Sequence, residues 1–491
     1  MRKLTIPGYE VWGLLGEGGM SEVWLAKHNA LGVPVVIKTL RRHLRPSTPA
    51  ADRILSEARL MARVSSPRIV RALDAGHVVD EGQSTPFLVQ EYVDGLDFAE
   101  LDGRRRAALG VGMPLWSVCR AMREVCLALR AAHQAGVVHR DLKPSNVFGE
   151  PELGIRLGDF GIAVARSETS HPEGAGTPAF MAPEQLKSGE VGRYTDVWGA
   201  GATACDLRYG HPPFANLECI LDPEAPPRLP HPLSPAEAYL QDVIKRMLAK
   251  DLGHRPDDIL APLYHFTMLS KALEPTPPQA ARTSANEIVF GRVILRFVVG
   301  NIAEATTDAI VSSANFEMRM RVGVGEALRL KGGEIIEEEA TRNGEQPLGS
   351  CVRTGPGALS TKHVFHAVSA WNECSCVGRA FARALLLAEE NSCISLSAPA
   401  LGTGYARVSM EMCASAMMTT LRRHVMLGGM RLRELTIWFD SDAKRVIYQD
   451  VAEEVLGILQ ARHFGPSDIG LPDERMAATG DAATCVDPDS M

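Results

Sequence analysis

The segment His139–Asn146 has the sequence HRDLKPSN and carries side chains suited to phosphoryl transfer. The Asp141 carboxylate can accept the proton of an incoming hydroxyl, and the Lys143 ammonium can neutralise a transferring γ-phosphate. Asn146 and Asp159, the latter opening an Asp-Phe-Gly triplet, offer oxygen atoms of the kind that Mg²⁺ prefers. The residue types and their order predict a site that moves a phosphoryl group from a Mg²⁺-bound nucleotide to a hydroxyl.

Two earlier segments supply the rest of a nucleotide site. Leu15–Val23 reads LGEGGMSEV, and its glycines let a hairpin close over a triphosphate without clashes from Cβ atoms, although an ordinary hairpin would also explain them. Lys38 ends the apolar run Val35–Ile37, where a charge is costly unless it is matched. Glu57 is the expected partner, because it lies in a segment whose apolar residues mark one face of a helix.

The order of these segments, followed by Met181–Glu184 (MAPE), resembles the eukaryotic-like Ser/Thr protein kinase family over about residues 9–269. The resemblance implies a bilobal α+β kinase fold that uses ATP and Mg²⁺ and acts on Ser or Thr of a protein substrate. It implies that Asn146 and Asp159 are the metal ligands. The implied catalytic residues are Asp141, Lys143, Lys38 and Glu57. The implied ATP-binding residues are Leu15, Gly16, Glu17, Gly18, Gly19, Val23, Val36, Lys38, Glu91 and Val93.

The same resemblance assigns structural roles outside the catalytic segment. Gln90 takes the gatekeeper position before the adenine-binding hinge, and Asp196 is expected to brace the catalytic loop. Arg255 is expected to pair with Glu184 in a partly buried bridge. The proline-rich stretch that follows Phe214 predicts that the helix usual at this place is short or lost.

The segment between the Asp-Phe-Gly triplet and Ala182 corresponds to an activation loop. A phosphate on this loop could pair with Arg140, which precedes the expected base, although a solvated loop that is never phosphorylated explains the same hydroxyls. Thr177 is also placed to contact the substrate hydroxyl site. The candidates for phosphorylation are Ser167, Thr169, Ser170 and Thr177.

Glycine-bearing loops follow two strand-like runs in the second half of the chain. Asp308–Asn315 reads DAIVSSAN and precedes RVGVGEAL at Arg321–Leu328, where glycines lead into a helix. Ile394–Tyr405 reads ISLSAPALGTGY. The free N–H groups of a helix N-terminus attract anions, and loops after separate parallel strands meet at one edge of a sheet. The pattern predicts a pocket that holds a diphosphate.

This order resembles the macrodomain family over about residues 286–459, which implies an α/β/α three-layer fold and a ligand such as ADP-ribose or an ADP-ribosylated protein. Asn301 stands where the family has its adenine-reading aspartate, and Met318–Val322 interrupts the usual glycine run. Gly325 takes the place of the acidic residue of hydrolytic members. The implied ADP-ribose-binding residues are Asn301, Ile302, Asn315, Gly323, Val324, Gly325, Gly402, Thr403, Gly404 and Tyr405.

Three other functions remain open for the second half. It could be a degenerate domain kept for protein contact, or a reader that recruits a weak kinase to ADP-ribosylated partners. It could also hydrolyse ADP-ribosyl groups.

The chain of 491 residues is too long for one hydrophobic core, which stops growing near about 250–300 residues. The expected order is a kinase domain at 9–272, a linker at 273–285 (LEPTPPQAARTSA), a macrodomain at 286–461 and a disordered tail at 462–491. In the macrodomain, strand-like runs at 288–299, 309–311, 364–368, 394–398 and 434–439 alternate with helix-like runs at 325–340, 377–389 and 410–425.

Charge and cysteine usage narrow the class of protein. A net charge of −7 argues against nucleic acid as the main partner. The ten cysteines are scattered and form no CxxC pair, which is typical of reduced thiols in the cytoplasm. No uncharged apolar run approaches the roughly 18 residues that a membrane span needs, so no membrane partner is expected.

Overall fold

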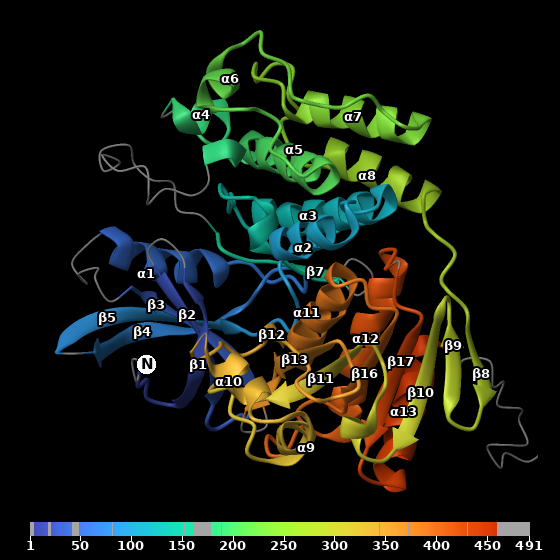
Figure 1. Ribbon diagram of the computed structural model, residues 1–491. Coiled ribbons are helices and arrows are strands. Elements are labelled where there is room, and N and C mark those ends of the chain that lie inside the picture. Colours follow the sequence, from blue (N-terminus) through green and yellow to red (C-terminus); the bar gives the residue numbers. More distant parts are fainter. Residues whose placement is uncertain are drawn as a thin grey trace, which may run out of the picture.

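The computed structural model consists of two domains joined by one connection (Figure 1). It describes residues 4–17, 21–41, 49–80, 82–150, 154–160, 178–187, 189–342, 344–371, 374–429 and 431–458. The expected disordered tail at 462–491 and most of the expected activation loop lie outside these residues.

The N-terminal lobe is an antiparallel five-stranded sheet with helix α1 (Pro49–Met61) beside it. Its strand order is β1-β2-β3-β5-β4. Alternate residues of β3 are buried, so Val35 and Ile37 face the core while Lys38 is left on the opposite face, toward the cleft. The strands are β1 (Tyr9–Glu17), β2 (Ser21–His28), β3 (Pro34–Leu40), β4 (Ala72–Asp80) and β5 (Gln83–Glu91).

The second lobe is helical and packs around α3 (Leu115–Gln134), which contacts both α5 and α8. Apolar residues of α3 recur at helical spacing and are fully buried, so one face of this helix forms the centre of the lobe. The other elements are α2 (Phe98–Leu109), η1 (Pro144–Asn146), β6 (Val147–Glu150), β7 (Gly154–Leu157), η3 (Pro178–Phe180), α4 (Pro183–Leu186), α5 (Arg193–Tyr209), α6 (Leu217–Leu221), α7 (Pro235–Met247) and α8 (Leu260–Ala272).

Two expectations for this lobe concern α6 and the Arg255–Glu184 bridge. The helix after Phe214 has only five residues, as the proline-rich sequence predicted. The expected bridge is bidentate, since Arg255 Nη1 lies 2.8 Å from Glu184 Oε1 and Nη2 lies 3.2 Å from Oε2. Both residues are buried, and the guanidinium carbon also lies 5.0 Å from the centre of the Trp198 ring.

The connection between the domains is shorter than the sequence indicated. Strand β8 (Ala280–Ser284) lies inside the segment 273–285 for which we expected a linker. It pairs with β9 (Glu287–Phe290) at the edge of the second-domain sheet. The connection before this strand therefore covers only 273–279. The sequence did not predict β8 because a polar edge strand shows no alternation of buried apolar residues.

The second domain is an α/β/α sandwich around an eight-stranded sheet of order β12-β13-β11-β16-β17-β10-β9-β8. Strand β11 (Ala309–Ala314) is buried on both faces: Val311 packs among α11, α12 and α13, whereas Ile310 packs toward α9 and α10. The other elements are β10 (Val293–Val299), η4 (Ile302–Glu304), α9 (Gly323–Gly332), α10 (Ile335–Thr341), β12 (Cys351–Thr354), β13 (His363–Val368), β14 (Ala370–Trp371), β15 (Cys374–Ser375), α11 (Val377–Glu390), β16 (Ser395–Pro399), α12 (Met410–Met426), β17 (Glu434–Phe439) and α13 (Asp442–Leu456).

Two runs of the second domain are each divided. The strand-like run 288–299 is the hairpin β9–β10, which turns at Gly291 with φ of +59°. The helix-like run 325–340 is two helices, because the chain turns at Gly333 with φ of +93°. The other expected strands and helices of this domain occur within one or two residues of the expected ends, except β11, which continues to Ala314.

An apolar cluster joins the two domains. Leu25 of the first domain packs with Met318 and Val368 of the second, and Trp12, Leu15 and Tyr92 lie around them with Phe316. None of these residues belongs to a single-domain core, so the contact is an interface formed by both halves of the chain. Among the described residues, no helix is long and apolar enough to cross a membrane.

We expect Arg255→Ala to lower the free energy of unfolding of the first domain by about 3–5 kcal/mol, because it leaves the buried Glu184 carboxylate without its partner. Urea unfolding followed by tryptophan fluorescence would measure this, since Trp198 lies against Arg255. Lys245→Ala is the control: its 3.3 Å pair with Asp242 is exposed, and its loss should cost less than about 1 kcal/mol. Equal effects of the two substitutions would contradict the argument.

Candidate active site and the second-domain cavity

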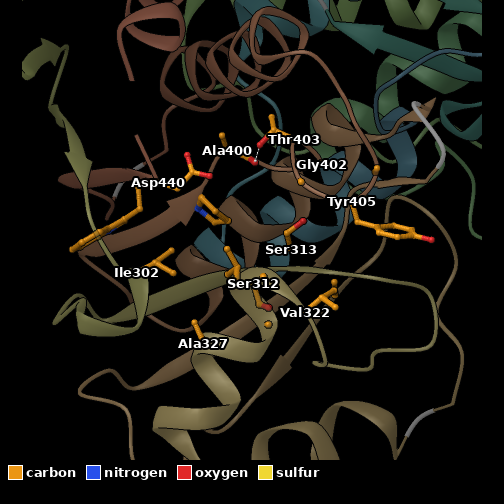
Figure 2. A pocket seen from close by; sticks show the side chains of 18 of the residues that line it. Ile302, Ser312, Ser313, Val322, Ala327, Ala400, Gly402, Thr403, Tyr405 and Asp440 are labelled. Carbon is orange, nitrogen blue, oxygen red and sulfur yellow. Dashed lines mark hydrogen bonds between the residues drawn. The ribbon is translucent and has the colours of Figure 1, made fainter. Parts of the chain in front are cut away.

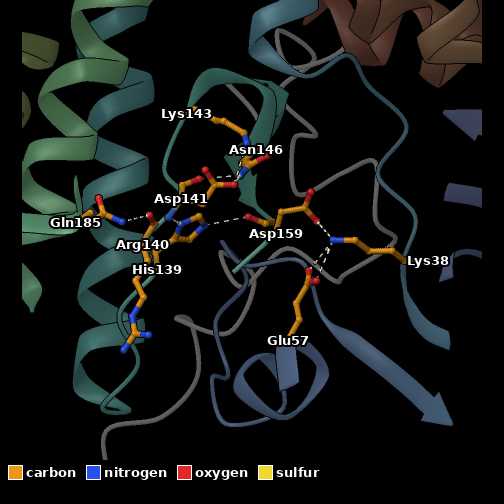
Figure 3. A network of polar contacts seen from close by, with 10 residues as sticks. Lys38, Glu57, His139, Arg140, Asp141, Lys143, Asn146, Asp159 and Gln185 are labelled. Atoms are coloured by element: carbon orange, nitrogen blue, oxygen red, sulfur yellow. Dashed lines mark hydrogen bonds and ion pairs between the residues drawn. The ribbon is translucent and has the colours of Figure 1, made fainter. Parts of the chain in front are cut away.

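One ammonium group lies between two carboxylates at the cleft between the lobes (Figure 3). Lys38 Nζ, on β3, lies 2.9 Å from Glu57 Oε2 on α1 and 3.0 Å from Asp159 Oδ1. Only 14% of the Lys38 side chain and 9% of the Glu57 side chain are exposed. The expected Lys38–Glu57 ion pair is therefore formed, and the same ammonium also binds the aspartate of the Asp-Phe-Gly triplet.

The pKa values of the two carboxylates beside Lys38 are shifted in opposite directions. Burial alone would lower the pKa of Lys38, but the charges of Asp159 and Glu57 outweigh it and raise that pKa. Burial would raise the pKa of Asp159, yet the Lys38 ammonium outweighs it and lowers the pKa, so Asp159 stays ionised. Burial raises the pKa of Glu57 to about 7, and Lys38 offsets this only in part.

The catalytic segment brings Asp141, Lys143 and Asn146 together, as the sequence predicted. Lys143 Nζ donates to Asp141 Oδ2 at 2.8 Å, and Asn146 Nδ2 donates to the Asp141 backbone oxygen at 2.7 Å. Asn146 belongs to the 3₁₀ turn η1 and is buried, so its position relative to Asp141 is fixed by the backbone. About a third of the Asp141 side chain is exposed, which leaves its carboxylate accessible from the cleft.

Asp196 on α5 binds the backbone at the start of this segment. Its Oδ2 accepts from the backbone N–H of His139 at 2.8 Å, and its Oδ1 accepts from that of Arg140 at 2.8 Å. His133 Nε2 lies 2.7 Å from Asp196 Oδ2. Because Asp196 is fully buried and both backbone bonds converge on it, the expected bracing role is confirmed.

The backbone at Asp159 is strained in a way that directs its carboxylate. Asp159 has φ of +53°, a conformation uncommon for residues other than glycine. The following Phe160 is buried, and its ring lies 4.7 Å from the ring of His139. The carboxylate that precedes this packed ring points toward Lys38 (Figure 3).

A pocket of about 310 Å³ opens beside these groups. Every predicted ATP-binding residue within the described part of the chain lines it, and so do Gln90 and Asp159. Gly18 and Gly19 lie outside the described residues. Tyr92, within the expected hinge 91–93, lines it too, and the lining residues that the sequence did not single out are Val70, Asp97, Ser145, Phe148, Gly158 and Arg379. All of these except Arg379 belong to the first domain. Arg379 belongs to the second domain, and no sequence signal placed it here.

A larger cavity, of about 790 Å³, lies at the carboxyl ends of β11, β16 and β17 (Figure 2). All ten residues predicted to bind ADP-ribose line it. The loop after β11 and the Gly-Thr-Gly turn after β16 surround one hollow, as expected for parallel strands whose ends share an edge. At Gly402, φ is +76° and a Cβ would approach Ala370 to 2.8 Å, so the turn requires glycine.

This cavity is also lined by residues that the sequence did not predict. Asp440 and Lys444 follow β17, and their side chains pair at 2.7 Å. They could have been found from the rule that ligands bind beyond the carboxyl ends of parallel strands. Asn301 has another task besides lining the cavity: its Oδ1 caps the turn η4 by accepting from Ala303 N–H at 3.0 Å. The remaining newly found residues with polar or aromatic side chains are Ser312, Ser313, Arg319, Arg321, Trp438 and Phe439.

The expected activation-loop residues cannot be placed. Ser167, Thr169, Ser170 and Thr177 all lie outside the described residues. Arg140, their expected partner, has φ of +70°, and its side chain points away from the Lys38 cluster. Its Nε is buried without a hydrogen-bond partner among the described residues.

Comparison with known proteins agrees with this geometry. A protein kinase domain matches residues 9–263, more than half of the chain. The chain belongs to the protein kinase family. A Macro domain matches residues 311–417, so the kinase domain is followed by a macrodomain. The predicted fusion and both predicted folds are confirmed.

The curated relatives are bacterial kinases. A probable serine/threonine-protein kinase of Corynebacterium efficiens is 34% identical over 214 residues, 42% of this chain and 31% of the relative. Serine/threonine-protein kinase Pkn1 of Myxococcus xanthus is 32% identical over 287 residues, 56% of this chain and 39% of the relative. The crystal structure of the Mycobacterium tuberculosis PknI kinase domain aligns with a TM-score of 0.44 at 26% identity, over 55% of this chain and 98% of that one. The chain spans about a third of the length of the Corynebacterium relatives.

Protein kinases use ATP with a divalent metal, and the kinase cleft has a donor set that fits such an ion. Asp159 offers an ionised carboxylate whose side chain is 42% exposed. The Asn146 amide nitrogen is used by Asp141, which leaves the amide oxygen to face another ligand. A carboxylate and an amide oxygen are hard donors of the kind that Mg²⁺ selects.

The raised pKa of Glu57 predicts how activity depends on pH. Glu57 loses its charge as the pH falls through about 7, and the Lys38–Glu57 ion pair is lost with it. We therefore expect kcat/KM for ATP to fall about tenfold per pH unit below that value. In Glu57→Gln, activity should be low at every pH and the inflection near 7 should be absent. An unchanged inflection in this variant would assign the titration to another group.

Proposed function

We propose that this chain is a Ser/Thr protein kinase that transfers the γ-phosphoryl group of Mg·ATP to a hydroxyl of a protein. The observation that carries the proposal is that Asp141 and Asn146 lie beside the Lys38–Asp159 pair (Figure 3), next to a pocket that Lys38 and Asp159 line. The names of the curated relatives support the choice of Ser and Thr as acceptors. The position of Lys143, two residues after Asp141, supports the same choice.

Each side chain of the cleft has a separate task in this proposal. Asp141 accepts a hydrogen bond from the attacking hydroxyl and orients it, and Lys143, 2.8 Å away, compensates charge on the transferring group. Lys38, held in place by Glu57, binds the nucleotide phosphates. When bound at Asn146 and Asp159, Mg²⁺ neutralises negative charge on the phosphates. The protein contributes mainly through positioning and preorganised charge.

A phosphate on the activation loop would activate such an enzyme by pairing with Arg140. The buried Nε of Arg140, without a partner among the described residues, supports this role. We propose Ser167, Thr169, Ser170 and Thr177 as the positions to be mapped.

We also propose 9–272 and 280–458 as the limits of the two folded domains. We place the chain in the cytoplasm, where its scattered cysteines would stay reduced.

We expect Asp141→Asn to lower kcat by a factor of roughly 10²–10⁴, because the amide cannot accept the hydroxyl proton. Transfer of labelled phosphate from Mg·ATP to a Ser/Thr-containing substrate protein, or to the chain itself, would measure it. Asp242→Asn, at an exposed position on α7, is the matched control and should leave kcat unchanged. Undiminished transfer by purified Asp141→Asn would contradict the assignment.

We further propose that the macrodomain binds ADP-ribose or an ADP-ribosylated protein. The cavity is large enough for a dinucleotide-sized ligand, and its two glycine-bearing loops offer backbone N–H groups and the start of α9 to a diphosphate. The partly exposed Trp438 lines the cavity and offers an aromatic ring to an adenine. Binding is favoured over hydrolysis because Gly325 offers no carboxylate, although Glu326 is adjacent.

Calorimetry with ADP-ribose on the full chain would test this proposal, with the kinase cleft saturated by a non-hydrolysable ATP analogue. We expect saturable heat below roughly millimolar ligand. A Cβ at Gly404 would meet no atom within 4 Å, so Gly404→Val should fold normally while its side chain narrows the cavity and weakens binding at least tenfold. Asp141→Asn should bind as the native chain does. The absence of heat would exclude a reader of ADP-ribose.

A further inference from the structure

The macrodomain is docked against the kinase at the hinge between its lobes. The Asp94 carboxylate, three residues after Glu91, accepts from the backbone N–H groups of Gly378 at 2.9 Å and of Arg379 at 3.0 Å. These are free N–H groups in the first turn of α11, so a carboxylate of one domain caps a helix of the other. The start of α11 is thereby fixed beside the adenine-binding hinge.

A second contact fixes the direction of α11. Arg383, one turn later, forms a bidentate pair with Glu100 of α2, with distances of 2.6 Å and 2.7 Å. Burial would raise the pKa of Glu100, but the hydrogen bonds and charge of Arg383 outweigh it and lower that pKa to about 2. Arg105 adds a 2.6 Å hydrogen bond to the backbone oxygen of Leu427. These contacts hold the face of α11 that carries Arg379 toward the kinase cleft.

Arg379 is the residue of the macrodomain that lines the kinase pocket. Its aliphatic stem passes over Gly349, where a Cβ would come within 2.8 Å of the arginine Cδ, so the stem has little freedom. Its side chain is only 15% exposed. The guanidinium makes no hydrogen bond to a described residue: Nε is buried without a partner, and Nη2 lies 4.0 Å from Glu100.

The buried Nε–H of Arg379 is costly unless a ligand completes it, because an unmade hydrogen bond loses the desolvation free energy of its group. Asp97 lines the same pocket, and its carboxylate, whose Oδ1 accepts from the Glu100 N–H at 2.9 Å, lies next to this cation. Together they present donors and an acceptor in the pocket that the hinge residue Glu91 and the phosphate-binding group Lys38 also line. The sugar of a nucleotide lies between its base and its phosphates, and its hydroxyls both donate and accept.

We propose that Arg379 of the macrodomain is a nucleotide-binding residue of the kinase cleft, where it donates to the ribose hydroxyls that Asp97 accepts from. The ATP site is then built from both domains, and the kinase half without its macrodomain has an incomplete site. The inference rests on the proposed nucleotide binding in this cleft, and it concerns affinity for the sugar, not the transfer step.

Binding of Mg·ADP and of its 2′,3′-dideoxy analogue to the full chain, measured by calorimetry, tests the inference without turnover. We expect the native chain to prefer the hydroxyl-bearing nucleotide. Arg379→Ala should weaken Mg·ADP binding about tenfold and leave the dideoxy analogue nearly unaffected, so the preference shrinks about tenfold to the part that Asp97 supplies. Arg379→Met, which keeps the stem over Gly349 and removes the donors, should behave as Arg379→Ala does.

Arg282→Ala, on the distant edge strand β8, is the control and should bind both nucleotides as the native chain does. Unchanged or tighter Mg·ADP binding by Arg379→Met would overturn the inference, and so would an equal loss for both nucleotides. If the native chain bound neither nucleotide, the proposed ATP site itself would fail. Binding by the native chain with no effect of Arg379 would reject this inference alone.

Discussion

The ammonium of Lys38 is shared by the carboxylates of Glu57 and Asp159, which come from opposite sides of the cleft. Lys38 belongs to the sheet of the first lobe, Glu57 to the helix beside it, and Asp159 to the second lobe. Opening of the cleft would separate the largely buried Lys38 ammonium from the Asp159 carboxylate. The pKa values of Asp159 and Glu57 both depend on this group.

The rest of the catalytic segment is held by a second, independent constraint. Asp196 accepts backbone N–H groups of His139 and Arg140, so the segment that carries Asp141 is fixed by a buried side chain of α5 rather than by its own loop. Positioning by a rigid helix is what a site needs when its catalysis consists of orientation and charge.

The macrodomain uses one loop for two purposes. Met318–Val322 interrupts the glycine run that is usual in the macrodomain family, and the packing of Met318 gives a physical reason for the interruption. Met318 has φ of +60° and is completely buried in the apolar cluster shared with Leu25 of the kinase sheet, while its neighbours Arg319 and Met320 line the macrodomain cavity. Met318 thus contributes to the domain interface. The loop that lines the macrodomain cavity also packs against β1 and β2, which line the kinase pocket.

The sequence by itself determined the two domains and the local chemistry, because motifs such as HRDLKPSN and the Gly-Thr-Gly turn depend on residues close together in the chain. It also predicted the pair Lys38–Glu57, since a charge that ends an apolar strand needs a partner, and its resemblance to protein kinases implied the pair Arg255–Glu184. It missed strand β8, which is polar and at an edge, and it gave no hint of Arg379 in the kinase pocket. Only the tertiary structure decided how the domains dock, because that contact joins Asp94 to residues 284 and 285 positions away, and no local pattern records such a distance.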